Sequence, residues 1–126
     1  MLRACRRLLK PGGRLAFYTI FITPGLPERE RRRARQSGPS AAYSRAEPQS
    51  LLRSAGFVQI EERDATDEYL RFTRDLLDAS ERHAKALRES IGEAAFAQRL
   101  SQRRAAIAAT EAGLLRRSLF VAERPR

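Results

Sequence analysis

Residues 9–22 read LKPGGRLAFYTIFI, and this stretch decides the fold. Pro11 cannot continue the hydrogen bonding of a helix, and the paired glycines that follow it allow a left-handed turn. Residues 15–22 are then almost entirely apolar, with aromatic and β-branched side chains at both odd and even positions. This pattern is typical of a strand that helices cover on both faces, as in a parallel α/β sheet. The sequence therefore predicts a buried strand over residues 14–22.

Two further segments have the composition of strands. Residues 57–63 begin apolar and end charged, which suits a strand at a sheet edge. Residues 117–123 have an apolar centre at Leu119 to Ala122. Helical periodicity and helix-ending glycines predict helices near residues 2–9, 47–55, 67–90 and 93–112.

The first helix has one apolar side, formed by Leu2, Cys5, Leu8 and Leu9. The last two helices are expected to form a hairpin insertion over residues 66–113, with a break or bend at Gly92. Within it, Tyr69 and Phe72 are expected to face the core of the hairpin, because their spacing follows the helical repeat.

Proline and glycine punctuate residues 23–43, which are therefore expected to form a loop. The charged centre of this loop, residues 28–35, forms either a solvated helical turn or a mobile segment. Ser44 with Glu47 three residues later has the pattern of a capping box, although Pro48 moves the expected helix start toward Glu47.

Length and composition are those of one soluble domain. The chain has 126 residues, of which 42% are hydrophobic, enough for one core. No apolar run approaches the roughly 20 residues that span a bilayer, and the N-terminus lacks the features of a signal peptide. A single cysteine, Cys5, excludes an internal disulfide and fits a reducing, cytoplasmic setting. A packed thiol is favoured there over a reactive one.

The net charge of +10 allows nucleic acid or an acidic surface as a partner. Arginine supplies 23 of the 25 basic residues, and asparagine is absent. Both features are expected of a GC-rich genome, and we expect a bacterial source. Because the arginines are spread along the whole chain, codon bias explains the charge better than nucleic-acid binding does.

The order of these motifs resembles the C-terminal part of class I S-adenosylmethionine (SAM)-dependent methyltransferases over essentially all 126 residues. In that family an LKPGG turn leads into the fifth strand, a helix ending in AGF leads into the sixth, and the seventh runs antiparallel between them. Residues 9–13, 55–57 and 118–123 match these places in order. The resemblance implies a partial Rossmann-like sheet, strands five to seven, with residues 66–113 as an inserted helical hairpin and possible substrate lid.

The same resemblance implies that the cofactor-binding half is missing. In the family, a glycine-rich turn after strand one receives the methionine part of SAM, and an acidic residue ending strand two binds the ribose. Gly12 and Gly13 do not replace that turn, because they precede a strand. No catalytic or cofactor-binding residue can therefore be assigned. SAM is expected in the parent enzyme, and neither SAM binding nor activity is expected of this chain alone.

Residues just beyond the carboxyl end of a parallel strand line the ligand crevice of open α/β sheets. That position makes Tyr18, Thr19, Phe21 and Tyr43 the substrate-side candidates, with a small-molecule methyl acceptor as the expected ligand. For each aromatic residue, core packing or loop anchoring is the more common role.

Other polar residues carry no predicted chemistry. His83 is expected to be a partly buried packing residue of the long helix. Asp75, Asp78 and Glu81 lie among basic residues at helical spacing, which predicts a salt-bridged solvent face instead of a metal site.

Two other classes of function stay open: a basic nucleic-acid-binding module using the arginines of residues 29–35, and an interaction protein using the helical hairpin. Strand 14–22 would also lack the fourth strand of the resembled fold along one edge. Self-association through that edge is therefore expected.

Overall fold

A computed structural model describes residues 1–37 and 47–126. The glycine turn has the geometry that the sequence predicts, since Gly12 has φ +78° and its N–H donates to the Arg124 carbonyl at 2.9 Å. The Arg124 N–H donates in turn to the Gly13 carbonyl at 2.8 Å. Strand β1 (Arg14–Ile22) begins at the next residue, so this turn starts the strand and joins it to the C-terminal segment.

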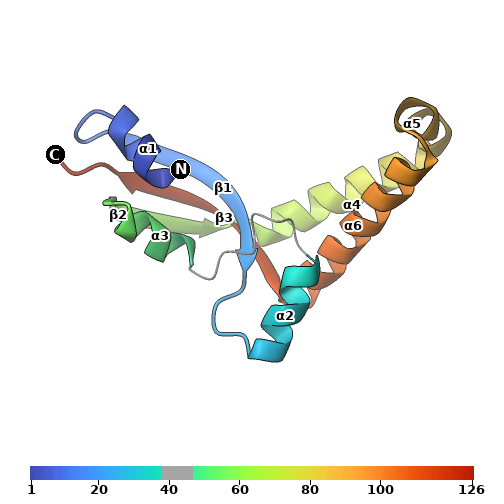
Figure 1. The fold of residues 1–126 in the computed structure, drawn as a ribbon, viewed down its shortest axis with the longest axis horizontal. Coiled ribbons are helices and arrows are strands. Elements are labelled where there is room, and N and C mark those ends of the chain that lie inside the picture. Colours follow the sequence, from blue (N-terminus) through green and yellow to red (C-terminus); the bar gives the residue numbers. More distant parts are fainter. Residues whose placement is uncertain (38–46) are drawn as a thin grey trace.

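The sheet has three strands in the order β1–β3–β2 (Figure 1). Strand β3 (Leu115–Glu123) lies in the centre and is antiparallel to both β1 and β2 (Val58–Asp64). The predicted placement of the last strand between the other two is therefore confirmed. Strand β3 begins two residues earlier than predicted. Strand β2 is an edge strand, and an irregularity between Val58 and Glu61 interrupts its register, where Gln59 has φ +52°.

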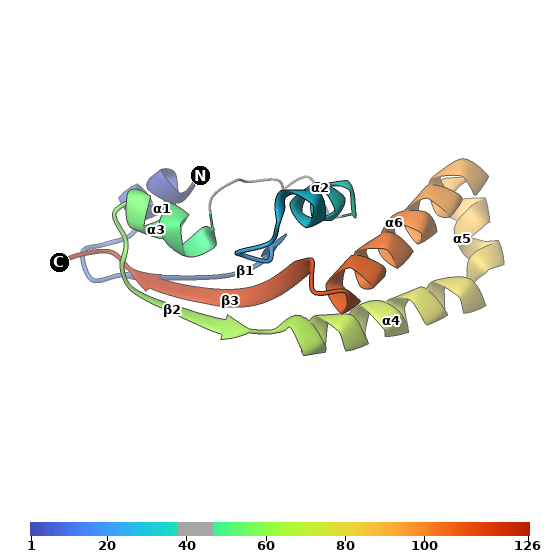
Figure 2. The same cartoon turned by 90° about the horizontal axis from the view of Figure 1, so that it is seen from below.

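Helices α1 (Leu2–Leu8) and α3 (Pro48–Ser54) cover one face of the sheet (Figure 2). Phe120 is fully buried beneath them, with its ring centroid 5.7 Å from that of Phe17 and 5.8 Å from that of Phe21. The main core comprises Phe21, Leu52, Ala55, Phe57, Phe120 and Ala122, with Leu2, Cys5 and Leu9 packed against it. Leu8 was expected on the buried side, but it is 87% exposed, because α1 ends there and the chain turns.

Helix α2 (Glu28–Ser37) occupies part of the segment for which a loop was expected. The helical alternative for residues 28–35 is the correct one, and the helix is longer than one turn. Ala34 explains its stability: this side chain has no exposed surface and packs with Ala109, Leu114 and Leu115 in a second core cluster. A single small residue therefore docks an otherwise charged helix.

Three helices form an arm that extends away from the sheet in Figure 1. Helix α4 (Thr66–Arg82) runs outward, α5 (Ala84–Ile91) forms the tip, and α6 (Glu93–Glu111) returns. One continuous helix over 67–90 was predicted, but it breaks at His83, where φ is −104° and ψ is +23°. The predicted break at Gly92 is confirmed, with φ +90°.

The inward face of α4 differs from the predicted one. Thr73 is 5% exposed, whereas Phe72 is 65% exposed, so the expectation that Phe72 faces the hairpin core was wrong. The small polar side chains of Thr73 and Ser80 permit close packing, and Arg103 of α6 donates to the Ser80 hydroxyl at 3.3 Å. Apolar spacing alone did not distinguish the two faces. Within the two described ranges, no helix has both the length and the apolar content needed to cross a bilayer.

Candidate functional site

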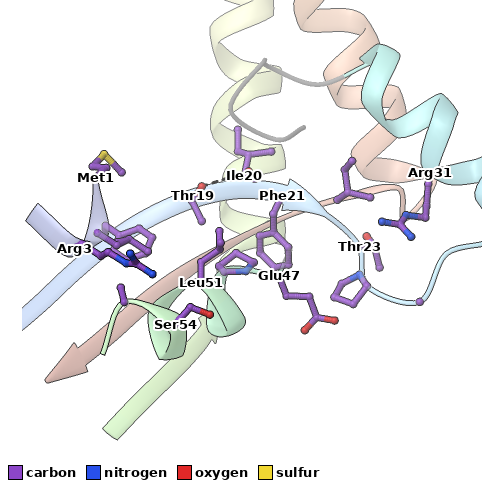
Figure 3. Close-up of a pocket in the computed structure, with 17 residues that line it drawn as sticks. Met1, Arg3, Thr19, Ile20, Phe21, Thr23, Arg31, Glu47, Leu51 and Ser54 are labelled. Atoms are coloured by element: carbon purple, nitrogen blue, oxygen red, sulfur yellow. Dashed lines mark hydrogen bonds between the residues drawn. The ribbon is translucent and has the colours of Figure 1, made fainter. Parts of the chain in front are cut away.

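A cavity of about 660 Å³ lies along the outer edge of β1 and beyond its carboxyl end (Figure 3). Its apolar lining includes Phe17 and Phe21 from β1, Pro48 and Leu51 from α3, and Ala55, which follows α3. Both odd and even residues of β1 line it, because among the described strands none pairs with this edge. The position matches the crevice in which open α/β sheets bind ligands.

Three charged side chains line the cavity: Arg3 from α1, Arg31 from α2 and Glu47 at the start of α3. None of them forms an ion pair within 4.0 Å of another described residue. Figure 3 shows Arg31 beyond the arrowhead of β1, Glu47 below the arrowhead and Arg3 nearer the middle of the strand. The carboxyl end of the strand therefore carries charges of both signs beside an apolar surface.

Two threonine hydroxyl groups of the cavity, those of Thr19 and Thr23, donate hydrogen bonds to backbone carbonyls. Thr23 donates its hydroxyl proton to the Gly113 carbonyl at 2.6 Å, and its N–H donates to the Leu114 carbonyl at 3.0 Å. Thr19 donates to the neighbouring Ile20 carbonyl at 3.4 Å, which is a long hydrogen bond. Thr23 thus joins the end of β1 to the base of the arm, while the Thr19 hydroxyl is held weakly.

Of the four substrate-side candidates, Thr19 and Phe21 line the cavity. Phe21 is also 8% exposed and belongs to the core. Tyr18 points to the opposite face of the sheet, as expected from the alternation of side chains along a strand, and it does not line the cavity. Tyr43 lies outside the described residues. Two of the four candidates, Thr19 and Phe21, therefore lie together in the cavity.

Sequence reasoning missed Arg3, Arg31 and Glu47. Arg31 was hidden in the charge run, where only the docking of Ala34 reveals which arginine faces the cavity. The expectation that Pro48 moves the helix start from Ser44 toward Glu47 is confirmed, since Glu47 is the N-cap and Pro48 the first helical position. The sequence did not indicate that the side chain of Glu47 lines a cavity.

His83 and the acidic residues of α4 have no shared site. His83 is exposed at the helix break, so the expectation of partial burial was wrong. Glu81 forms an ion pair with Arg104 of α6 at 2.6 Å, and Arg74 forms one with Glu111 at 3.0 Å. These pairs bridge helices α4 and α6. Within residues 1–37 and 47–126, no cluster of three His, Cys, Asp or Glu residues has the arrangement of a metal site.

Asp64 ends strand β2, and its carboxylate is already engaged. The side chain accepts the Thr66 N–H at 2.8 Å and pairs with Arg116 at 3.3 Å. Hydrogen bonding to Thr66, aided by the charge of Arg116, lowers the pKa of Asp64 below its ordinary value of 3.8. This carboxylate therefore stabilises the start of α4 and is not presented to a ligand.

Asp64 does not fit the ribose site of SAM. A SAM site of the resembled type requires a glycine turn after a strand and a carboxylate free to accept two ribose hydroxyls. Gly25 follows β1 with φ +81° and has open space within 4 Å of its Cβ direction. Since Asp64 is engaged, it does not supply the ribose carboxylate.

The fold is similar to parts of solved methyltransferases. A phosphoethanolamine N-methyltransferase of Haemonchus contortus, in complex with phosphomonomethylethanolamine and S-adenosylhomocysteine, matches with a TM-score of 0.78 at 18% identity. The same enzyme in complex with SAM matches with a TM-score of 0.77 at 18% identity. Each match covers 99% of this chain and 29% of the other.

A protein of Galdieria sulphuraria, described as a sarcosine dimethylglycine methyltransferase, matches with a TM-score of 0.80 at 15% identity. That match covers 98% of this chain and 46% of the other. The chain thus spans less than half the length of these proteins, and at such identities the likeness shows the fold. No protein-family model and no curated protein sequence matches the chain.

Proposed function

We propose that this chain is the acceptor side of a class I SAM-dependent methyltransferase that methylates a small molecule. The observation that supports the proposal is the match of 98–99% of the chain to portions of solved methyltransferases, at TM-scores of 0.77 to 0.80. In this proposal β1, β2 and β3 are strands five, six and seven of a Rossmann-like sheet. The protein operates in a reducing, cytoplasmic setting.

The chain's contribution to the reaction is positioning. SAM, when bound by the other half of the enzyme, supplies an electrophilic methyl group, and the acceptor must be held in line with it. In the proposed enzyme, the apolar wall of Phe21, Leu51 and Pro48 excludes water, and Thr19 and the charged residues orient the acceptor. In this proposal Tyr43 also belongs to the acceptor side, whereas Tyr18, which does not line the cavity, has no role in it.

Residues 66–113 serve as a substrate lid in this proposal. The base of the arm is joined directly to the cavity, because Ala109 of α6 packs against Ala34 of α2, and α2 also carries Arg31. A displacement of α6 would therefore move a charged wall of the cavity.

Expression of residues 1–126 together with the coding region that immediately precedes Met1 tests the proposal. The expected product contains a glycine-rich strand–turn and forms S-adenosylhomocysteine from SAM when small acceptors are added. A preceding region without a cofactor-binding half, or a combined product that does not bind SAM, contradicts the proposed function.

A further inference from the structure

Helix α4 carries an apolar stripe that no described element covers. Phe72 is 65% exposed, Leu76 is 38% exposed, and Tyr69 lies partly buried one turn before Phe72. These positions are three and four residues apart, so the three side chains form one stripe along the helix. Single exposed apolar residues are common on protein surfaces, whereas a contiguous row of large apolar side chains marks an interaction site.

The stripe lies away from the contact between α4 and α6. Thr73 is 5% exposed, and Ser80 accepts a hydrogen bond from Arg103 of α6 at 3.3 Å, so these residues mark the inward side of α4. Figure 1 shows α4 and α6 side by side in an arm that projects beyond the sheet. Because the packing of the arm uses the inward side, the exposed ring of Phe72 contributes little to the fold.

One flank of the stripe carries two opposite charges. Arg71 and Asp75 are exposed and lie one helical turn apart, on the same side of the helix. Neither forms an ion pair within 4.0 Å with the other or with another described residue. Glu68, one turn earlier, is already paired with Arg63 at 3.0 Å. The described fold therefore uses neither the charge of Arg71 nor that of Asp75.

This pattern is complementary to itself when two α4 helices pair in opposite directions. A twofold axis between such helices brings the same flank of both together. With the axis near Thr73, Arg71 of each copy faces Asp75 of the other, and the two Phe72 rings lie close together. A parallel pair of helices would instead place like charges opposite each other.

The surface of the chain is large enough for such an interface. The chain exposes 8485 Å², whereas a compact monomer of its mass, 14.3 kDa, exposes about 6800 Å². The difference exceeds the roughly 800 Å² that each partner contributes to an interface of standard size. In Figure 1 the arm is the part that extends from the sheet, and α4 forms one side of it.

We propose that the α4 stripe, formed by Tyr69, Phe72 and Leu76, docks on the same stripe of a second copy of this chain in an antiparallel, twofold arrangement. Two ion pairs between Arg71 and Asp75 flank the apolar contact and set its direction. The inference goes beyond the proposed function, because it needs neither SAM nor an acceptor. It also differs from association along β1, since it uses a helix of the arm.

Sedimentation velocity measures the proposed dimer. The Tyr18→Glu chain serves as the background beside the wild type, because charge on β1 opposes association through the strand edge. A discrete dimer with a micromolar dissociation constant is expected in this background. Phe72→Ser should weaken the dimer at least about tenfold, since a large apolar side chain leaves the centre of the interface. Leu8→Ser, which removes an exposed apolar side chain from α1, is the control and should change nothing.

Charge variants test the direction of the pairing. Arg71→Glu and Asp75→Arg should each weaken the dimer about tenfold, because each places like charges opposite one another. The double variant should restore the dimer, and the two single variants should form a mixed dimer when they are combined. Arg99→Glu, at an exposed position of α6, is the matched control and should have no effect.

The inference is overturned if the Tyr18→Glu chain is a monomer, if Phe72→Ser dimerises as strongly as Leu8→Ser, or if the two single charge variants do not associate when mixed. The mixed dimer separates a lost contact from a lost fold, because unfolded variants would not recover on mixing. A combined polypeptide that includes the region preceding Met1 is expected to dimerise as well. If it is monomeric although the chain alone dimerises, the cofactor-binding half covers the stripe, and a second copy is not its occupant.

Discussion

The guanidinium of Arg117 lies 4.3 Å from the centroid of the Tyr18 ring, on the sheet face opposite to Phe17, Thr19 and Phe21. It also lies 5.7 Å from the ring of Tyr69 on α4. The contact covers Tyr18 only in part, since 48% of this residue is exposed. A cation over an aromatic ring contributes only about 0.5–1 kcal/mol at an exposed site. This face of β1 is therefore apolar and accessible.

We expect the isolated chain to self-associate through β1, because its outer edge has no partner among the described strands and the Tyr18 face is exposed. Tyr18→Glu should reduce the association, since charge on an exposed strand opposes pairing. Leu8→Glu, which replaces an apolar residue that is 87% exposed on α1, is the control and should have no effect. Light scattering at tens of micromolar measures both. A monodisperse wild-type monomer that melts cooperatively above about 60 °C would show that the edge is protected.

The core beneath α1 and α3 depends on Phe120, which is fully buried between Phe17 and Phe21. Phe120→Ala should destabilise the chain by about 3–5 kcal/mol, a large part of the stability of a small domain. The urea midpoint measures the loss, with Leu8→Ala expected to change it by less than about 0.5 kcal/mol. Equal urea midpoints for Phe120→Ala and the wild type would contradict the assignment of Phe120 to the core.

The carboxylate of Asp64 predicts a pH dependence of stability. Its pKa is lower in the folded chain than the ordinary 3.8, so it stabilises the fold above that value. This contribution is lost as the pH falls through the folded pKa. It is small, because the side chain is 54% exposed. Wild type and Asp64→Asn should differ in urea midpoint at pH 6 and converge below pH 3. A constant difference across that range would contradict the assignment.

The strands were predictable, because the LKPGG turn and the apolar runs are local signals, whereas their order followed only from the resemblance to methyltransferases. Helix α2 was not, since its docking depends on Ala34 meeting Ala109, two residues 75 positions apart whose contact no local pattern reveals. The exposure of Phe72 has the same cause. Apolar residues occur on adjacent faces of α4, and only the position of α6 determines which of these faces is buried.

The candidate site was predictable only to the extent that it belongs to β1. Thr19 and Phe21 follow from their place near the end of the strand. Tyr18 does not line the cavity, although Ile20 and Ile22 of the same strand do, so alternation along the strand would not have separated them. Arg31 and Glu47 come from two helices that the fold brings to one cavity. Their spacing in the sequence does not predict that they line the same cavity.

The arginine content predicts little affinity for nucleic acid, because Arg74 and Arg104 are engaged in ion pairs and the arginines are dispersed. Binding to a duplex should be weak and lost at moderate salt. Fluorescence anisotropy across a salt series measures it. Tight, sequence-selective binding at about 150 mM salt would favour the basic binding module over the methyltransferase.

Calorimetric titration of SAM tests the central claim most directly, with residues 1–126 alone and then with the combined polypeptide that includes the region preceding Met1. The account predicts no binding to the chain alone, because residues 1–126 correspond to strands five to seven of the resembled fold and the first strands of that fold bind SAM. It predicts micromolar binding to the combined polypeptide. Micromolar binding to residues 1–126 alone would contradict the assignment of this chain to the acceptor side.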